Sequence, residues 1–283
     1  MRKIAVASGK GGTGKTFLTT GLFALMEHSG RSAVLVDCDA EVPNASVFVH
    51  GEEIGVRETR VLCPVVNPSK CVFCGKCAAV CRFNAVSCIP AAKYIKISED
   101  LCHGCGACLY ECGSNAIEKA YKTVGKATAY GKNGRIRIVE ARIKTGEHSP
   151  VPVIREAIGY AEESGAEVLL LDAPPGCSCP FVNTVTEADE VILVSEPTPF
   201  GLSDLKHTVE VLRKLGKPFC AVINRADLGD GKMKAWLAAE NIPLVAEIPY
   251  SQHIAELYSG GKIAAVEDPA LKEIFENLLK RIL

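Results

Sequence analysis

Residues 9–16 have the composition and spacing of a loop that binds phosphate. The sequence Gly9-Lys10-Gly11-Gly12-Thr13-Gly14-Lys15-Thr16 matches G-x-x-x-x-G-K-[ST] and lies between an apolar run and a helical pattern. In such a loop, backbone N–H groups and the N-terminus of the following helix converge on phosphate oxygens. Lys15 would add a positive charge, and the Thr16 hydroxyl would bind Mg²⁺. The predicted phosphate site consists of Gly11, Gly12, Thr13, Gly14, Lys15 and Thr16.

Three acidic residues follow apolar runs that we expect to be buried strands. Asp37 and Asp39 end the run 32–36, and Asp172 ends the run 166–171. The C-terminal ends of parallel strands meet at one edge of a sheet, where the phosphate loop also lies, so these carboxylates should face the nucleotide. We expect Asp172 to hold a water molecule on Mg²⁺ rather than the metal itself.

Cysteine is unusually abundant, with 14 residues, and two runs repeat the spacing C-x2-C-x2-C-x3-C. The runs are Cys71, Cys74, Cys77, Cys81 and Cys102, Cys105, Cys108, Cys112. In two-cluster proteins with this spacing, the fourth cysteine of each run binds the other cluster. We therefore expect two [4Fe–4S] clusters, one on Cys71, Cys74, Cys77, Cys112 and one on Cys102, Cys105, Cys108, Cys81. Zinc is the alternative metal, but it does not explain the repeated four-cysteine spacing.

The composition is that of a globular protein with a full hydrophobic core. The chain has 283 residues, 48% of them hydrophobic, and a formal net charge of -1, which gives no reason to expect a nucleic-acid partner. We find no signal peptide and no apolar run of membrane-spanning length, so we expect a cytoplasmic protein without a membrane partner. The amphipathic stretch 270–283 carries acidic residues among its basic ones, which favours a helix packed on the sheet over a membrane anchor.

Apolar runs that alternate with helical patterns predict an α/β fold with a mainly parallel, doubly wound sheet. The expected strands are 3–8, 32–36, 166–171, 190–194, 218–223 and 243–248, and the expected helices are 17–29, 150–164, 202–215, 231–240 and 251–258. We expect a short helix and loop over 42–55, and extended structure over 119–145. Periodic helices are lost and cysteines gained between these segments, so we predict a nucleotide domain, 1–60 and 119–283, interrupted by a small α+β ferredoxin-like domain, 61–118.

The phosphate loop with its additional Lys10 and the two aspartate-ended strands resemble the MinD/ParA/Mrp superfamily of P-loop ATPases, which includes the nitrogenase iron protein. The motifs that carry the resemblance are residues 10–16, Leu35-Val36-Asp37-Cys38-Asp39 and Leu171-Asp172-Ala173-Pro174-Pro175-Gly176. They lie on both sides of the cysteine runs. The whole chain resembles the subgroup of this superfamily that carries an inserted ferredoxin domain.

The resemblance implies a nucleotide-sandwich dimer, formed with a second copy or with a paralogous ATPase. Lys10 would supply charge to the partner's phosphate site, beside the chain's own Lys15, and Asp39 would position the attacking water. Asp37 and Asp172 would support Mg²⁺ and its waters. Such a site suits phosphoryl transfer, which depends mainly on positioning and charge, and it should be slow until a dimer or partner completes it.

The identity of the base rests on Asn224-Arg225-Ala226-Asp227, which follows a predicted strand. The resemblance implies that Asn224 and Arg225 contact adenine and that Pro249 lines the other side of the base, which favours ATP and ADP. The alternative is an N-[KR]-x-D guanine site in which Asp227 accepts hydrogen bonds from the base.

Six cysteines lie outside the two runs. We expect Cys38, Cys63, Cys88 and Cys220 to be small buried hydrophobic residues. Cys177 and Cys179 form C-x-C directly after the Asp172 motif. The resemblance implies that two such pairs facing each other across a dimer could bind a bridging metal, although a purely structural role is the simpler interpretation.

Together these features predict an ATPase that couples nucleotide-driven dimer switching to two clusters, for electron transfer to a partner or for assembly of an iron–sulfur or other metallocofactor. The alternative is a regulatory or positioning switch in which the clusters sense redox state or stabilise the fold. A third hypothesis is a ferredoxin module whose nucleotide site hardly turns over.

Overall fold

The structure is a computed structural model that describes residues 1–283. The chain forms two compact units. The larger unit comprises Met1–Arg57, Lys126–Arg142 and Ser149–Leu283, and the smaller unit comprises Glu58–Gly125 and Ile143–His148. The smaller unit is therefore longer than the predicted 61–118, because residues 143–148 return to it and the Lys144 amide donates a hydrogen bond to the Val124 carbonyl.

A nine-stranded sheet forms the centre of the larger unit, in the order β13-β12-β11-β1-β10-β2-β9-β8-β3. Its strands are β1 (Arg2–Ala7), β2 (Ala33–Asp37), β3 (Glu52–Leu62), β8 (Tyr121–Lys132), β9 (Arg135–Ile143), β10 (Val168–Asp172), β11 (Glu190–Ser195), β12 (Phe219–Asn224) and β13 (Leu244–Ile248). All neighbours from β13 to β9 pair in parallel. The strands β2 and β10 are buried on both faces, as their continuous apolar sequences predict.

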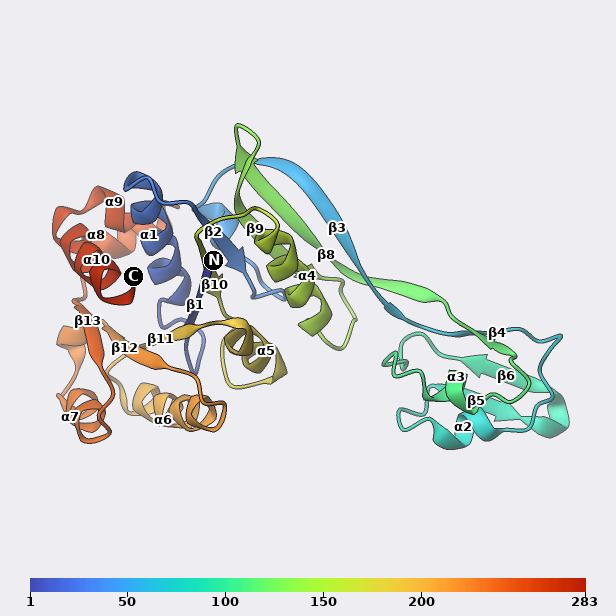
Figure 1. Cartoon of the computed structure of the whole chain (residues 1–283). Coiled ribbons are helices and arrows are strands. Elements are labelled where there is room, and N and C mark those ends of the chain that lie inside the picture. The colour runs from blue at the N-terminus through green and yellow to red at the C-terminus, as the bar shows by residue number, and fades with distance from the viewer. The chain divides into compact units, whose positions relative to one another are not determined.

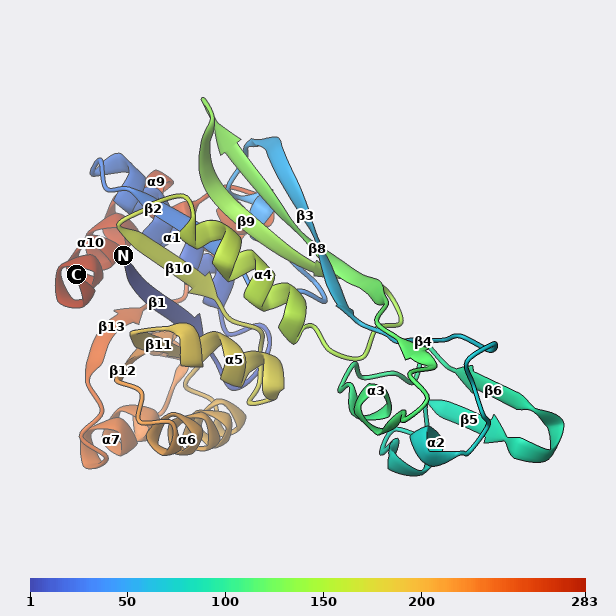
Figure 2. The same ribbon diagram turned by 45° about the vertical axis from the view of Figure 1, so that its right-hand side comes forward.

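Helices cover both faces of the parallel part of this sheet (Figures 1 and 2). One face packs against α1 (Lys15–His28), α9 (Ala264–Glu267) and α10 (Pro269–Ile282), and the other against α4 (Val151–Glu162), α5 (Cys179–Glu187) and α6 (Pro199–Lys214). The remaining elements are α7 (Lys232–Ala239), α8 (Gln252–Ser259), η1 (Ala45–Val47) and η3 (Ala226–Leu228). This arrangement confirms the predicted α/β fold with a large, mainly parallel sheet.

The segment 42–55 differs from the prediction. A short helix, η1, is present, but Glu52–Gly55 begin the long strand β3 rather than a loop. Ile54 and Val56 are apolar residues two apart, with Gly55 between them, and this period of two fits a strand. The extended segment 119–145 contains a hairpin, in which Asn133 and Gly134 connect β8 to β9 with φ values of 52° and 74°, as a type I′ turn requires.

The smaller unit consists of two short helices and two small antiparallel sheets. Its elements are β4 (Val65–Val66), α2 (Lys76–Val80), β5 (Val86–Ile89), η2 (Pro90–Ala92), β6 (Tyr94–Ile97), α3 (Ala107–Glu111) and β7 (Ile117–Glu118). Strand β4 pairs with β7, β5 pairs with β6, and α2 packs on α3. The helices and the chain around them repeat, so that Gly75 and Gly106 both precede a helix with positive φ.

The C-terminal helix α10 packs on the larger unit, as expected of an amphipathic helix whose apolar stripe faces a sheet. Its buried residues are Leu271, Phe275, Leu278 and Ile282. The Phe275 ring meets Phe17 edge to face at 5.7 Å and lies against Gly21, so it fills the space beside α1.

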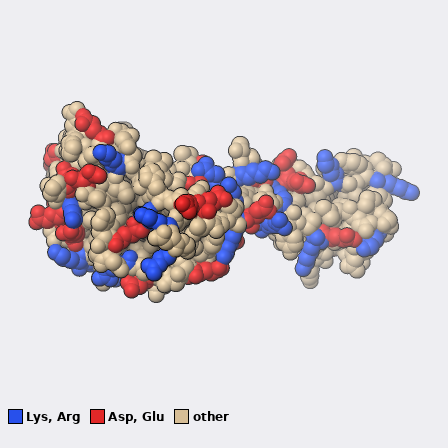
Figure 3. All heavy atoms as spheres, turned by 90° about the horizontal axis from the view of Figure 1, so that it is seen from above, with Lys and Arg blue, Asp and Glu red and all other residues tan.

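None of the helices has the length and apolar composition that a membrane span requires. Acidic and basic side chains are interspersed on the face of the larger unit in Figure 3.

Phe275→Ala should lower the free energy of unfolding by about 3–5 kcal/mol, because it removes a fully buried ring and leaves a cavity between α10 and α1. Urea unfolding would measure the change. Phe200→Ala is the matched control, since this ring is 80% exposed and its removal should change stability by less than about 0.5 kcal/mol. Equal losses in the two variants would contradict the packing of α10 described above.

Candidate functional site

The phosphate loop connects β1 to α1 and is held open by glycines in the left-handed region. Gly12 and Gly14 have φ values of 79° and 97°, and Gly14 is the N-cap of α1. The Asn224 side chain, at the end of β12, donates a 2.9 Å hydrogen bond to the Thr13 carbonyl. This bond ties the loop to the end of β12 and leaves the N-terminus of α1 free to bind an anion.

Asp172 connects the end of β10 to the first turn of α1. Its carboxylate accepts hydrogen bonds of 2.6 Å from the Thr16 hydroxyl and 3.1 Å from the Thr19 hydroxyl. Asp172 is buried behind Thr16, which itself lines a pocket. A metal ion bound by Thr16 would have room for waters between itself and Asp172. The indirect action of Asp172 on Mg²⁺ stays a prediction.

Asp37 has a different environment from the one that the sequence suggested. It is fully buried, and its carboxylate accepts backbone hydrogen bonds from Asp39, Asn44 and Ala45 at 3.1, 2.9 and 2.9 Å. These bonds hold the turn between β2 and η1. Asp37 does not line the pocket, whereas Asp39 and Asn44 do. Its structural task is therefore to place Asp39 at the pocket.

The buried charges at this edge of the sheet are unbalanced. Burial raises the pKa of Asp172, Asp37 and Asp39, and the charge of Asp172 raises that of Asp37 further. Burial lowers the pKa of Lys15, although these carboxylates oppose the shift. One lysine faces three carboxyl groups, so a divalent cation bound at Thr16 would favour the ionised forms of these carboxyl groups.

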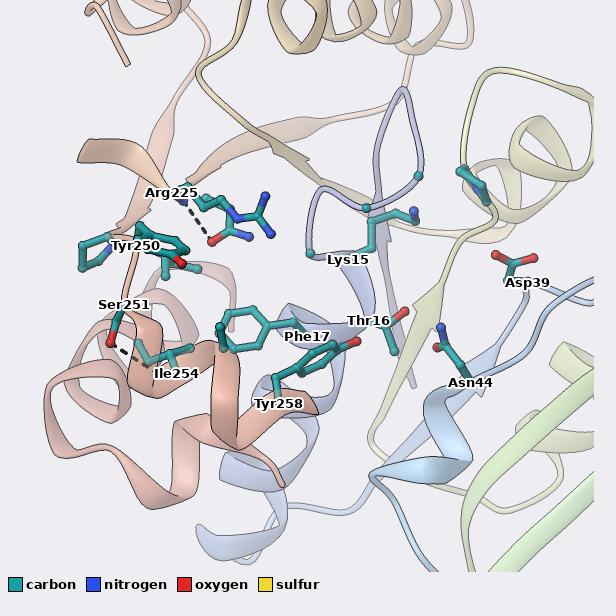
Figure 4. Close-up of a pocket in the computed structure, with 18 residues that line it drawn as sticks. Lys15, Thr16, Phe17, Asp39, Asn44, Arg225, Tyr250, Ser251, Ile254 and Tyr258 are labelled. Carbon is teal, nitrogen blue, oxygen red and sulfur yellow. Dashed lines mark hydrogen bonds between the residues drawn. The ribbon is translucent and has the colours of Figure 1, made fainter. Parts of the chain in front are cut away.

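The pocket itself has a volume of about 300 Å³ and contains the predicted residues of both ends of a nucleotide. Figure 4 shows Lys15, Thr16 and Asp39 at one end and Arg225, Tyr250 and Ile254 at the other. It is lined by Gly11, Gly12, Gly14, Lys15, Thr16, Phe17, Asp39, Asn44, Pro175, Asn224, Arg225, Ile248, Pro249, Tyr250, Ser251, Ile254, Ala255 and Tyr258. Thr13 contributes its carbonyl to the loop but does not line the pocket.

Asp227, the residue needed for guanine recognition, does not line the pocket. Its carboxylate accepts a 2.6 Å hydrogen bond from the Tyr250 amide and so fixes the turn after β13. The guanine alternative therefore loses its support. Arg225 lines the pocket, adopts a left-handed conformation with φ 54°, and forms a 2.7 Å ion pair with Glu196.

Lys10 lies outside the pocket of its own chain. Its ammonium group is 3.8 Å from the Glu196 carboxylate, and its side chain is one-third exposed. A lysine in this position cannot be counted among the residues that line the chain's own phosphate site.

The pocket also has an aromatic wall that the sequence motifs do not identify. Phe17 follows the phosphate motif directly, and its ring meets Tyr258 edge to face at 5.7 Å. Ser251, Ile254, Ala255 and Tyr258 come from α8 and its N-cap. Their i, i+3, i+4 and i+7 spacing was a usable signal, because it places them on one face of the predicted helix 251–258.

In the smaller unit, eight cysteines line two cavities, four in each. One cavity is lined by Cys71, Cys74, Cys77 and Cys112, and the other by Cys81, Cys102, Cys105 and Cys108. The fourth cysteine of each run thus stands with the first three of the other run.

The two sets also have the same local geometry. The Cys81 sulfur accepts a 3.3 Å hydrogen bond from the Ala85 amide, and the Cys112 sulfur accepts a 3.3 Å hydrogen bond from the Ala116 amide.

No three His, Cys, Asp or Glu side chains converge as one bound ion would require. Thiols arranged around a cavity fit a multi-iron cluster better than a single tetrahedral zinc ion.

The other cysteines are distributed between the two units. Cys38, Cys63 and Cys220 are buried, as expected, but Cys88 is half-buried on β5, where its side-chain direction is set by the strand. Cys177 and Cys179 are exposed at the N-terminus of α5, and the Cys177 sulfur lies 3.4 Å from the Thr208 hydroxyl.

Comparison with known proteins identifies related chains over nearly the whole length. The sequence profile described as "CobQ/CobB/MinD/ParA nucleotide binding domain" matches residues 4–264. An uncharacterised protein of Methanocaldococcus jannaschii is 32% identical over 93% of this chain and 91% of its own. A protein of Pyrococcus horikoshii named "iron-sulfur cluster carrier protein" is 21% identical over 99% of this chain and 85% of its own.

Solved structures share the fold. The septum site-determining protein MinD of Pyrococcus horikoshii, solved with Mg-ADP, superimposes with a TM-score of 0.60. It is 19% identical in sequence, and the match covers 99% of this chain and 95% of that one.

Gly14→Ala should weaken nucleotide binding and destabilise the larger unit by at least about 1–2 kcal/mol. A methyl group there would collide with the Asn224 side-chain nitrogen, at a φ of 97° that alanine disfavours. The control is Gly30→Ala, which has φ 77° but nothing within 4 Å, so it should cost stability without affecting binding. Calorimetric titration with Mg·ADP would compare them, and equal affinities would contradict the proposed geometry.

Binding of Mg·ADP should release protons near pH 6, because burial raises the pKa of Asp172 to about 6 and a bound Mg²⁺ would favour its ionised form. Affinity should therefore rise with pH through this range. In the free protein, burial favours the neutral form of Asp172. The free energy of unfolding should therefore be higher at low pH and should fall as the pH rises through about 6.

Titrations in buffers of different ionisation enthalpy would measure the proton release. Asp172→Asn should reduce the release, and a heat of binding that is independent of the buffer in the wild-type protein would contradict this assignment.

Proposed function

Because the chain belongs to the CobQ/CobB/MinD/ParA family of nucleotide-binding domains, we propose that it is an ATPase that couples nucleotide-dependent dimerisation to two [4Fe–4S] clusters. The single observation that carries this proposal is that one chain holds both a Mg·nucleotide-type pocket and two crossed sets of four thiols. The output would be electron transfer to a partner protein or assembly of a metallocofactor.

In the nucleotide site, Lys15 and the amides of the phosphate loop would bind the β- and γ-phosphates of ATP. Thr16 would bind Mg²⁺, with Asp172 accepting hydrogen bonds from its waters. Asp39 lines the pocket on the Mg²⁺ side, where it could orient the attacking water. Asn224, Arg225 and Pro249 would surround the adenine. Hydrolysis would then depend on positioning and charge rather than on covalent chemistry by the protein.

Dimerisation would complete this site. Lys10 lies outside its own pocket and is partly exposed, which leaves it available to a second chain. We propose that it supplies positive charge to the phosphates bound by that chain, either a second copy or a paralogous ATPase. Hydrolysis by the isolated chain would accordingly be slow.

The crossed thiol sets would hold the clusters, which supply one-electron chemistry when bound. Cys71, Cys74, Cys77 and Cys112 would hold one, and Cys81, Cys102, Cys105 and Cys108 the other. Four thiolates around each cluster favour electron transfer. The name of the Pyrococcus horikoshii relative, a cluster carrier, favours assembly instead. A bridging metal between the exposed Cys177 and Cys179 of two chains would also favour assembly.

A second candidate is a regulatory or positioning switch, in which the clusters sense redox state or stabilise the smaller unit. The structural similarity to MinD favours it, because that protein is named as a septum site-determining protein.

The two candidates differ in whether ATP acts on the clusters. If the coupling is correct, ATP should shift the cluster reduction potentials, measured anaerobically, in the wild-type protein but not in Lys15→Ala, which should also lose hydrolysis because it lacks the buried loop charge. Lys214→Ala, exposed at the end of α6, is the control and should behave as wild type.

Hydrolysis retained by Lys15→Ala would contradict the assigned site. Potentials that do not respond to ATP, together with an ATPase rate unaffected by cluster loss, would contradict the coupling and favour the switch.

A further inference from the structure

Tyr258, in α8, lines the pocket at the phosphate loop, and two other aromatic rings hold its own ring in place. It stacks on Phe48, with the ring centroids 4.5 Å apart and the planes 19° from parallel. The Phe17 ring meets it edge to face, at 5.7 Å and 77°. These contacts fix the direction of the Tyr258 ring before a ligand binds, so the hydroxyl at its end is preorganised.

The Tyr258 hydroxyl is available to a ligand in the pocket. Figure 4 shows the ring extending from α8 toward Thr16, with the hydroxyl oxygen at the end nearer Thr16. This hydroxyl has no hydrogen bond with another residue of the chain. The hydroxyl of a buried or half-buried tyrosine usually has a hydrogen-bond partner, so a partner from the ligand would complete this arrangement.

The carboxylates behind the phosphate loop keep this hydroxyl in its protonated form. Burial, together with the charges of Asp172 and Asp37, raises the pKa of Tyr258 to about 12. Asp172 accepts the 2.6 Å hydrogen bond from Thr16, so the Tyr258 hydroxyl lies on the side of the pocket where Mg²⁺ and phosphate would bind. At neutral pH it can therefore donate a hydrogen bond to an anionic oxygen.

The hydroxyl reaches the pocket between its two ends. Arg225 and Ile254 lie at the end proposed for the base, and Lys15 and Thr16 lie at the phosphate end. In a phosphate loop, the lysine reaches the β- and γ-phosphates, and the threonine binds Mg²⁺. The α-phosphate lies between these groups and the ribose. A side chain that extends from the base end toward Thr16 meets the nucleotide at this point.

We propose that the Tyr258 hydroxyl donates a hydrogen bond to a non-bridging oxygen of the α-phosphate of the bound nucleotide. This inference rests on the proposed function, because it presumes a nucleotide in the pocket. An anionic phosphate oxygen is a stronger acceptor than a neutral ribose hydroxyl, which favours the phosphate over the sugar as the partner. Tyr258 is thus a nucleotide-binding residue that lies far outside the phosphate motif in the sequence.

The test is calorimetric titration of the full-length protein with Mg·ADP and with the two diastereomers of Mg·ADPαS. Tyr258→Phe keeps both ring contacts and removes only the hydroxyl, so its affinity for Mg·ADP should fall about tenfold. A similar loss is expected with one diastereomer. The loss should nearly disappear with the diastereomer in which sulfur replaces the accepting oxygen, because sulfur is the weaker acceptor.

Tyr160→Phe is the matched control, because it removes the same atom from a tyrosine of α4 whose ring lies 3.8 Å from the Arg57 guanidinium, outside the pocket. It should bind all three nucleotides as the wild type does. Titration with Mg·2′-deoxy-ADP separates the phosphate from the ribose, and Tyr258→Phe should still lose about tenfold in affinity.

Three results would overturn the inference: equal affinities of Tyr258→Phe and the wild type for Mg·ADP, the same loss with both diastereomers, or a loss that disappears with the deoxynucleotide. Each of them leaves nucleotide binding by the wild type intact. A wild-type protein that binds no Mg·ADP would instead overturn the proposed function, and this inference with it.

Discussion

The hydrogen bond between the Thr16 hydroxyl and Asp172 is the contact on which the nucleotide site depends. It ties the first turn of α1 to the end of β10, and β10 lies between β1 and β2 in the sheet. The strands that carry the phosphate loop and Asp37 are therefore fixed relative to the same carboxylate. The arrangement lowers the stability of the free protein, because burial opposes both the ionisation of Asp172 and the protonation of Lys15. A site that gains stability when a cation and a nucleotide bind is suited to act as a switch.

The same edge of the sheet is where the chain leaves for the smaller unit and returns from it. Residues 39–47 follow β2 past the pocket into β3, and on the return β9 pairs with β2, with Asp37 opposite Glu140. Asp37 holds the outgoing turn through its three backbone hydrogen bonds. The chain passes between the two units four times, at residues 57–58, 125–126, 142–143 and 148–149.

Much of this could be predicted from the sequence, because spacing alone specifies the phosphate loop, the aspartate-ended strands and the cysteine runs. The parallel strands were predictable for a related reason, since burial on both faces leaves continuous apolar runs such as 168–171. Strand β3 was not, because its pairing with β8 brings together segments from opposite sides of the cysteine runs. The role of Asp37 was also out of reach, because the sequence does not show that backbone amides occupy its carboxylate. The aromatic wall formed by Phe17 and Tyr258 depends on how α1 and α8 pack together.

The position of β10 has a consequence for how the protein is made. Its partners β1 and β2 are synthesised early, but β10 itself follows the smaller unit in the chain. During translation, the segments of the smaller unit are therefore complete while the central sheet still lacks its middle strand. Folding of the smaller unit would shorten the loop that must close before β2 and β10 can pair. The free-energy cost of closing a loop rises by only about 0.6 kcal/mol for each doubling of its length. The segments of the smaller unit are thus synthesised before the nucleotide site can be complete.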